Sequence, residues 1–191
     1  MIYMAAGNSR RFGSNKLFYP IDGKPMYRHA LERLAAICER HSDWEIVLVS
    51  QYEELLEQGR PFAHRTVFSP ESRDGASWTI KNGLKEADDT EAFVFFTADQ
   101  PWLRGETVLE LIELFLREGK GIACVEHSGK TGNPCIFSRK YFGELMELEG
   151  DVGGKRVIRK HREDTAVLEV LDERELTDVD VAGRITKYGR R

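Results

Sequence analysis

Short apolar runs recur along the chain at the length of β-strands. Residues 46–50 (IVLVS), 93–97 (FVFFT) and 121–125 (GIACV) are nearly continuous and rich in β-branched or aromatic residues. Such runs are typical of strands that are covered on both faces, as in a parallel sheet. A further run at 166–170 (AVLEV) alternates more strongly between apolar and polar positions. We therefore expect this last strand at an edge of the sheet.

Amphipathic patterns of helical period lie between these runs. Segments 24–40, 76–87 and 106–119 place apolar residues three or four positions apart, which predicts one buried stripe on each helix. The stripes consist of Met26, Ala30, Leu34 and Ile37; of Ala76, Ile80, Leu84 and Ala87; and of Val108, Leu111, Ile112 and Phe115. Pro25 suits the first turn of the first helix, and Gly119 can end the third. These stripes are expected to face the core.

The alternation of strands and helices predicts the architecture. Such a chain forms right-handed βαβ crossovers and an open α/β sheet. We expect residues 1–191 to form a single domain with a mostly parallel, Rossmann-like sheet flanked by helices, since no repeat or low-complexity linker divides the chain. Ligands of such sheets bind beyond the carboxyl ends of the strands. The loop after residues 1–4 would lie at that edge.

Composition narrows the possible functions. The formal net charge of −4 gives no general positive field, so no nucleic-acid partner is expected. Cys38, Cys124 and Cys135 are odd in number and widely spaced, which predicts buried free thiols and no disulfide framework or structural zinc site. No stretch approaches the roughly 20 apolar residues of a membrane span, and the start lacks the signal-peptide pattern. We therefore expect a cytoplasmic enzyme or binding protein with no membrane partner.

The loop AAGNSRRFGSNK at residues 5–16 has the composition of a phosphate cradle. Small residues let the backbone approach a ligand and offer its N–H groups. They are Ala5, Ala6, Gly7 and Gly13. Arg11 adds a planar fork of donors and Lys16 a mobile point charge, and both suit phosphate oxygens. The glycine spacing matches neither a Walker A loop nor a dinucleotide-binding fingerprint. The alternative is a solvated loop with incidental charges.

The spacing Ala-Ala-Gly-x-Ser-x-Arg-Phe-Gly-x-x-Lys resembles the motif of the nucleotidyltransferases related to molybdenum cofactor cytidylyltransferase and molybdopterin guanylyltransferase. Their fold is of the nucleotide-diphospho-sugar transferase type. In that family the loop holds the triphosphate of the incoming nucleotide. The resemblance implies this role for Gly7, Ser9, Arg11 and Lys16, together with the small residues named above.

Two acidic segments extend the resemblance. TADQPWL at residues 97–103 is similar to the family's Asp-Gln-Pro segment at the end of a central strand. Asp99 there can hold Mg²⁺ against a phosphate, because hard cations prefer oxygen ligands; a turn or cap is the alternative. ELTDVDVAGRI resembles the family's Asp-Ile-Asp-Thr-Pro segment, with Asp178 and Asp180 as the carboxylates and Val181-Ala182 in place of Thr-Pro. Asp180 would be the second metal ligand, or part of an exposed acidic turn.

Residues 132–158 give the longest match. They resemble the cytidylyltransferase Gly-His-Pro, Phe-Ser and Gly-Asp-x-Gly-Ala-Arg blocks, which face the second substrate in the family. The resemblance implies that the acceptor is bound by Asn133, Pro134, Asp151 and Gly153. Asn133 replaces the family's histidine, and Gly154-Lys155 replaces Ala-Arg. Asp151 could instead cap the helix expected after this block. RDGASWTIKNG at 73–83 is similar to a helix start that places Ser77, on the loop, near the nucleotide.

Together these matches imply nucleotidyl transfer. An acceptor phosphate attacks the α-phosphorus of a nucleotide, while Arg11, Lys16 and a Mg²⁺ ion at Asp99 offset the charge. In the resembled families the Ala-Ala-Gly start accompanies cytidylyl transfer, which favours CTP. The acceptor would be molybdenum-bearing molybdopterin, and a molybdenum hydroxylase would receive the product. The alternatives are another base or acceptor, such as GTP or a sugar or polyol phosphate, and a non-catalytic chaperone that binds the finished cofactor.

Overall fold

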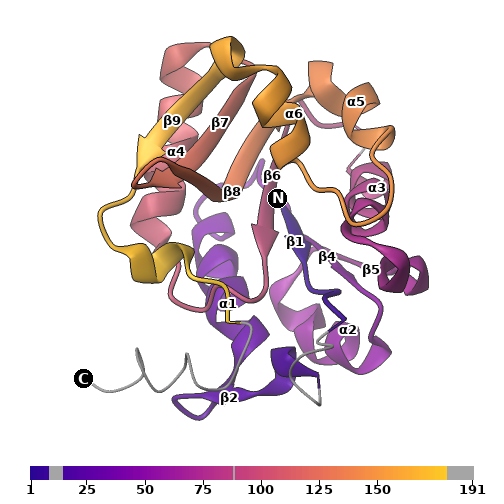
Figure 1. Cartoon of the computed structure of the whole chain (residues 1–191). Coiled ribbons are helices and arrows are strands. Elements are labelled where there is room, and N and C mark those ends of the chain that lie inside the picture. The colour runs from indigo at the N-terminus through magenta and orange to yellow at the C-terminus, as the bar shows by residue number, and fades with distance from the viewer. Residues whose placement is uncertain (9–14, 88, 180–191) are drawn as a thin grey trace.

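The apolar runs form one sheet, shown in Figure 1. The computed structural model describes residues 1–8, 15–87 and 89–179. Across the described residues the seven-stranded sheet has the order β5-β4-β1-β6-β8-β7-β9. Its strands are β1 (Ile2–Met4), β4 (Val47–Ser50), β5 (Arg65–Phe68), β6 (Ala92–Thr97), β7 (Ile122–His127), β8 (Lys130–Ser138) and β9 (Thr165–Glu169).

The direction of the strands confirms the expected fold class. Neighbouring strands are parallel except at β8, which runs antiparallel to both β6 and β7. β9 pairs with β7 at one end of the strand order, as its alternating pattern predicted. The central strands are covered on both faces; all four residues of β4 are buried. The continuous apolar runs therefore reflect burial on two sides.

Helices cover the two faces of the sheet. They are α1 (Met26–Cys38), α2 (Glu53–Gly59), α3 (Ala76–Glu86), α4 (Gly105–Glu118), α5 (Phe142–Met146) and α6 (Lys155–Lys160). One hydrophobic cluster joins the sheet to α1, α2 and α4, and a second joins its other face to α3, α5 and α6. The three predicted helices, α1, α3 and α4, are confirmed. Gly119 ends α4 in the left-handed conformation, with φ of 64°.

Short elements connect these layers. A two-stranded hairpin consists of β2 (Pro20–Ile21) and β3 (Lys24–Pro25). The 3-10 turns are η1 (Lys16–Phe18), η2 (Arg60–Phe62), η3 (Pro70–Asp74), η4 (Arg139–Tyr141), η5 (Arg162–Asp164) and η6 (Glu173–Leu176). All three cysteines are buried and free, as expected. Among the described residues, no helix is long and apolar enough to cross a membrane.

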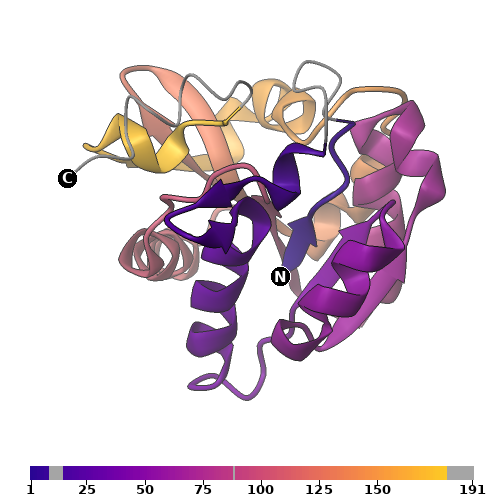
Figure 2. The same cartoon turned by 90° about the horizontal axis from the view of Figure 1, so that it is seen from below.

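The carboxyl ends of the parallel strands gather at one edge, which Figure 2 views from below. The loop after β1, the β4–α2 junction and the residues after β6 meet there. Because β8 is reversed, its first residues reach this edge: Cys135 pairs with Phe95, and the chain before Cys135 runs past the end of β6. Segments far apart in the sequence are thereby brought together.

Candidate functional site

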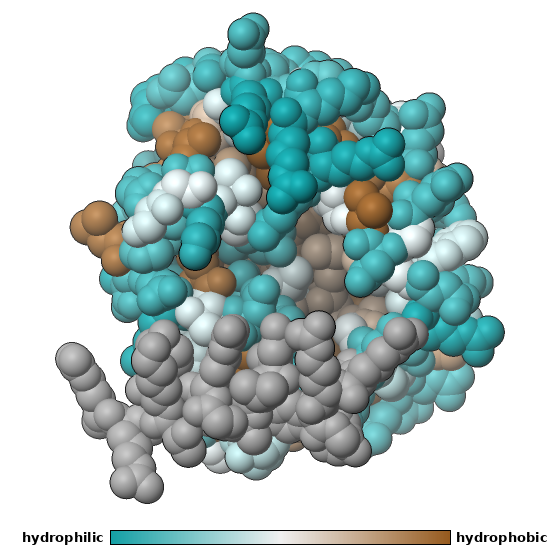
Figure 3. Space-filling model, in the orientation of Figure 1, coloured by the Kyte–Doolittle hydropathy of each residue, from teal (hydrophilic) through white to brown (hydrophobic). Residues whose placement is uncertain are grey.

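A cavity of about 440 Å³ opens at this edge. Figure 3, in the orientation of Figure 1, shows a hollow with a pale floor between hydrophilic side chains. The cavity is lined by Met4, Ala6, Gly7, Asn8, Lys16, Leu17, Ser72, Arg73, Asp74, Gly75, Ala76, Thr79, Thr97, Ala98, Asp99 and Asp151. We call it the first cavity. Charged groups of both signs thus face a space of ligand size.

Lys16 and Asp99 meet in the first cavity. Lys16 lies in η1, whose start is capped by Asn15 Oδ1 accepting from Leu17 N at 3.1 Å. Its Nζ donates to Asp99 Oδ2 at 2.8 Å, and the two side chains are 10% and 21% exposed. Asp99 follows β6 at the carboxyl edge. The structure therefore brings together the two residues predicted to bind phosphate and metal.

The backbone of the loop is held by the β4–α2 junction. Three side chains of this junction donate hydrogen bonds to carbonyl oxygens of the loop. Ser50 Oγ donates to Ala5 O at 2.7 Å, Gln51 Nε2 to Ala6 O at 2.6 Å, and Tyr52 Oη to Gly7 O at 3.0 Å. Of the predicted nucleotide-binding residues, Ala6 and Gly7 line the first cavity. Ala5 is fully buried and does not line it. Ser9, Arg11 and Gly13 lie outside the described residues.

Ser77 does not lie on a loop, contrary to expectation. It belongs to the first turn of α3, is fully buried and does not line the first cavity. Within the described part of the chain, its Oγ has no hydrogen-bond partner. α3 begins at Ala76, where the helical period placed it; the preceding Gly75 has φ of 148° and touches Gly150 so closely that a Cβ would lie 2.2 Å from that backbone. Gly75 and Ala76 form the rim of the cavity instead.

Asp151 caps a helix, although not the one expected. Its Oδ1 accepts from Ala76 N at 3.3 Å, and Ser77 N donates to Gly150 O at 3.2 Å. Residues 150–151 thus cap α3, whereas α6 begins after Gly154 without a side-chain cap. Asp151 also lines the first cavity.

A second cavity, of about 370 Å³, lies beside the first. It is lined by Gln100, His127, Lys130, Thr131, Gly132, Asn133, Lys155, Glu173, Leu176, Thr177 and Asp178. Of the predicted acceptor residues, Asn133 lines it, while Pro134 and Gly153 line neither cavity. Asp99 lines the first cavity and Gln100 the second, so consecutive residues contribute to the two linings.

Residues 172–179, which we call the strap, close one side of the second cavity. Gln100 Nε2 donates to Leu176 O at 3.2 Å and to Asp178 Oδ1 at 2.9 Å, and Val179 N donates to Asp99 O at 3.0 Å. Asp178, one of the two carboxylates of the acidic motif, therefore contacts Gln100, the residue after Asp99. These bonds hold Asp178 close to the end of β6.

Glu175 anchors the strap to α4. Its buried carboxylate accepts from Thr107 Oγ1 at 2.5 Å, from Arg104 N at 3.1 Å and from Arg104 Nε at 2.7 Å. Glu175 could not be predicted as a buried residue from the sequence, because a glutamate among other charged residues is usually exposed.

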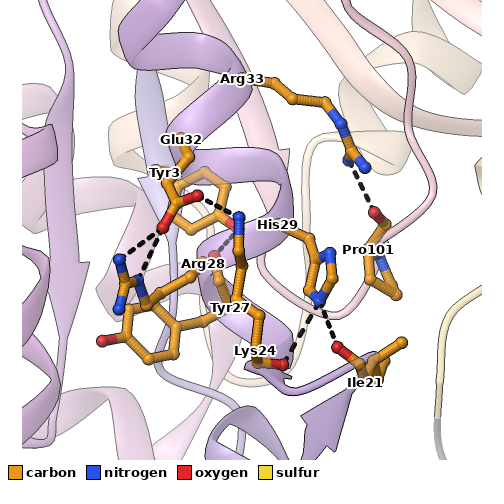
Figure 4. A network of polar contacts seen from close by, with 9 residues as sticks. All are labelled: Tyr3, Ile21, Lys24, Tyr27, Arg28, His29, Glu32, Arg33 and Pro101. Atoms are coloured by element: carbon orange, nitrogen blue, oxygen red, sulfur yellow. Dashed lines mark hydrogen bonds and ion pairs between the residues drawn. The ribbon is translucent and has the colours of Figure 1, made fainter.

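Polar residues of α1 hold the loops that carry Lys16 and Asp99 (Figure 4). Arg33 Nη1 donates to Pro101 O at 2.7 Å and to Leu103 O at 3.1 Å. His29 Nε2 lies 2.9 Å from Ile21 O in the hairpin that follows η1. Burial lowers the pKa of Arg33 from its usual value. One helix therefore positions both loops.

The metal site was predicted at Asp99 and Asp180. Asp180 lies outside the described residues. Within the described part of the chain, no group of three or more His, Cys, Asp or Glu side chains could hold a metal ion. Asp99 offers a partly exposed carboxylate beside a cavity. A single carboxylate suits Mg²⁺ when substrate phosphates and waters complete the coordination.

Comparisons with known proteins identify the relatives of this chain. The sequence model of a family described as "MobA-like NTP transferase domain" matches residues 1–165. Purine catabolism protein PucB of Bacillus subtilis is 27% identical over 190 residues, covering 94% of this chain and 90% of that protein. A probable molybdenum cofactor guanylyltransferase of Thermococcus kodakarensis is 37% identical over 122 residues, covering 64% of this chain and 56% of that protein. The solved homologue of Mycobacterium tuberculosis Rv0371c from Mycobacterium sp. strain JC1 has a TM-score of 0.76 and 26% identity, over 97% of this chain and 92% of that chain.

Proposed function

Because the chain belongs to the MobA-like NTP transferase family of nucleotidyltransferases, we propose that it transfers the nucleotidyl group of CTP to a molybdopterin-type acceptor. The observation that carries this proposal is a pair of cavities whose linings contain the consecutive residues Asp99 and Gln100. A transferase must hold two substrates with the reacting atoms in contact, since positioning supplies much of the catalysis. Two adjoining cavities meet this need.

The first cavity is the proposed donor site. Lys16 supplies a positive charge at its floor, and the backbone of residues 6–8 lines its wall. These groups suit a triphosphate, because ammonium and backbone N–H groups are donors to phosphate oxygens. Arg11, Ser9 and Gly13 are proposed to complete this site, on the strength of the motif alone.

Asp99 is the proposed ligand of Mg²⁺, with Asp180 as a second ligand on the strength of the motif. The ion would supply charge neutralisation between the nucleotide phosphates and the acceptor. Lys16 Nζ donates to Asp99 Oδ2 at 2.8 Å, and the second carboxylate oxygen of Asp99 would remain to hold the ion.

The reaction needs no protein nucleophile. An oxygen of the acceptor phosphate forms a bond to the α-phosphorus, the bond from that phosphorus to the bridging oxygen breaks, and pyrophosphate leaves with the electron pair. Lys16 stabilises the negative charge on the departing pyrophosphate. Gln100 and the strap hold the acceptor side of the site in place through their contacts with Leu176 and Asp178.

The second cavity is the proposed acceptor site. Lys130 and Lys155 bring positive charge to it, and Asn133 brings an amide. An acceptor with a phosphate and a polar ring system has matching chemistry. Pro134, Asp151 and Gly153 were predicted for this role as well, and Asp151 lines the donor side instead.

GTP is the second candidate for the nucleotide. The Ala5-Ala6-Gly7 start favours CTP, whereas the Thermococcus kodakarensis relative is named a guanylyltransferase. Ala6 lines the cavity, and a side chain at this position would narrow the space for a base. With CTP the product would be a cytosine dinucleotide cofactor for a molybdenum hydroxylase, and with GTP the corresponding guanine dinucleotide.

Pyrophosphate release tests this function. The protein is incubated with Mg²⁺ and CTP, GTP, UTP or ATP, with and without molybdenum-loaded molybdopterin. Release with CTP only when the pterin is present is the expected result. Release with another nucleotide or acceptor keeps the transfer reaction and replaces the substrate. Tight binding of the finished dinucleotide without any release would instead support a cofactor chaperone.

A further inference from the structure

Three consecutive side chains brace three consecutive carbonyl groups of the donor loop. The donors are residues 50–52, at the end of β4 and before α2, and the acceptors are the carbonyl oxygens of residues 5–7, at 2.6–3.0 Å. These contacts tie the donor loop to residues at the end of the neighbouring strand β4.

The braces fix which way the peptide groups point. The peptide bonds between residues 5 and 8 are trans, so each carbonyl is opposed to the N–H of the next residue. Carbonyls turned toward residues 50–52 therefore turn the N–H groups of Ala6, Gly7 and Asn8 the other way. The same three residues line the first cavity. Successive N–H groups on one side of a loop form an anion-binding concavity.

Gln51 also joins two walls of the first cavity. Its Nε2 carries two hydrogens; besides Ala6 O, it donates to Asn8 Oδ1 at 3.0 Å. Asn8 Nδ2 in turn donates to Arg73 O at 2.8 Å. Arg73 belongs to η3, whose residues form the opposite wall. One amide thus fixes both the direction of the loop and its distance from η3.

We propose that Gln51 and Tyr52 are positioning residues for phosphate binding: they hold loop 5–8 with its N–H groups directed into the first cavity. The inference rests on the proposed function and deepens it, because it names the residues that prepare the loop for a triphosphate. Without the braces, a carbonyl oxygen could rotate toward the phosphates and repel them. Preorganised donors avoid that reorganisation when the anion binds.

Two substitutions separate this role from simple packing. Tyr52→Phe removes one hydroxyl and keeps the ring. Gln51→Glu keeps the shape but sets a carboxylate against two acceptor oxygens, Ala6 O and Asn8 Oδ1. Gln58→Glu is the matched control, since it makes the same change at an exposed position of α2 that lines neither cavity.

The binding of inorganic tripolyphosphate with Mg²⁺, measured by titration calorimetry, tests the proposal. We expect the dissociation constant to rise about threefold in Tyr52→Phe and at least about tenfold in Gln51→Glu, as one or two hydrogen bonds are lost. Gln58→Glu should bind like the unaltered protein. Melting temperatures are recorded for each variant, so that weaker binding is compared only among folded proteins.

The outcomes distinguish the inference from the proposed function. If the unaltered protein binds tripolyphosphate and folded Tyr52→Phe and Gln51→Glu bind it equally well, the braces are only structural and the inference is overturned. If the unaltered protein binds no tripolyphosphate, the proposed donor site is wrong and the inference fails with it. Weaker binding in the two variants but not in the control supports both.

Discussion

Lys16 and Asp99 form a pair whose partners are needed separately during the proposed reaction. Both side chains are mostly buried, and their charged atoms lie 2.8 Å apart. An ion pair in a partly desolvated site is stronger than one at the surface, so it keeps both groups ordered before a ligand arrives. A nucleotide with its metal ion offers each group a partner of opposite charge. Lys16 and Asp99 can then separate without leaving either charge unpaired.

Replacing Lys16 by alanine should damage nucleotide use. We expect Lys16→Ala to raise the nucleotide KM and to lower turnover by about 100-fold, the usual effect of removing one preorganised donor. Steady-state pyrophosphate release measures both. Lys85→Ala, at an exposed position on α3, is the control. Unchanged kinetics in Lys16→Ala would refute the role of Lys16 in the donor site.

The metal role of Asp99 leads to a different measurement. Asp99→Asn keeps the size of the side chain and removes its charge, so we expect most of the activity supported by Mg²⁺ to be lost. A titration of Mg²⁺ against pyrophosphate release shows this. Asp22→Asn, in the exposed turn of the hairpin, should behave normally. An unaltered Mg²⁺ dependence in Asp99→Asn would leave Asp99 with a structural role only.

Sequence chemistry located Lys16 and Asp99 but not the residues that hold them. The two stand out because charge beside small residues at a strand end indicates a ligand. Gln51 and Glu175 give no such signal, since their partners are backbone groups or side chains distant in the sequence. The helical period of segment 76–87 placed Ser77 within α3, and it was the motif that placed this residue on a loop.

At the level of elements, long periodic segments were predictable and short ones were not. α1, α3 and α4 each bury one stripe over three turns or more, which leaves a clear period. β8 was missed: its first four residues include a glycine and an asparagine and are partly exposed, so it does not form a continuous apolar run. Its reversed direction depends on pairing with β6 and β7, and a single strand's pattern carries no direction.

We expect the position of the strap to affect binding of the acceptor more than binding of the nucleotide. Glu175→Ala leaves Thr107 Oγ1 and Arg104 N without their acceptor in a buried place, which should cost about 2 kcal/mol of unfolding free energy. Because Asp178 sits on the strap, the KM of the acceptor should rise more than that of the nucleotide. Chemical denaturation and steady-state kinetics measure the two effects.

Glu118→Ala, at an exposed position near the end of α4, is the control for the strap. A variant Glu175→Ala that is destabilised but has the same ratio of the two KM values would mean that the strap does not shape the acceptor site.

On the scale of the whole molecule, Asp164 ties together the side of the sheet away from the first cavity. It accepts from Lys140 Nζ at 2.7 Å, from Tyr141 Oη at 2.5 Å and from Gly121 N at 3.1 Å. These contacts join the chain before β7 and β9 to η4. The hydrogen bond from Lys140, with that from Tyr141, holds the pKa of Asp164 well below its usual value.

The pH dependence of stability follows from that shift. A carboxylate whose folded-state pKa is lowered stabilises the protein above its unfolded pKa of about 4, and this contribution is lost as the pH falls further. We expect Asp164→Asn to cost about 1 kcal/mol at pH 7, a modest value because the side chain is 34% exposed. Urea denaturation at pH 7 and pH 3 should show the difference shrinking. A constant difference would contradict the assignment.

The contribution of the consecutive residues Asp99 and Gln100 to the two cavities bears on how the reaction ends. In the proposed reaction each substrate would occupy one cavity, and the joined product would occupy both at once. Once one half of such a molecule is bound, the other half is presented to its cavity at an effective concentration in the millimolar range. The product should therefore dissociate more slowly than either substrate, and its departure should limit the rate of turnover. A recipient protein that binds the exposed half of the product before the other half dissociates would speed product release.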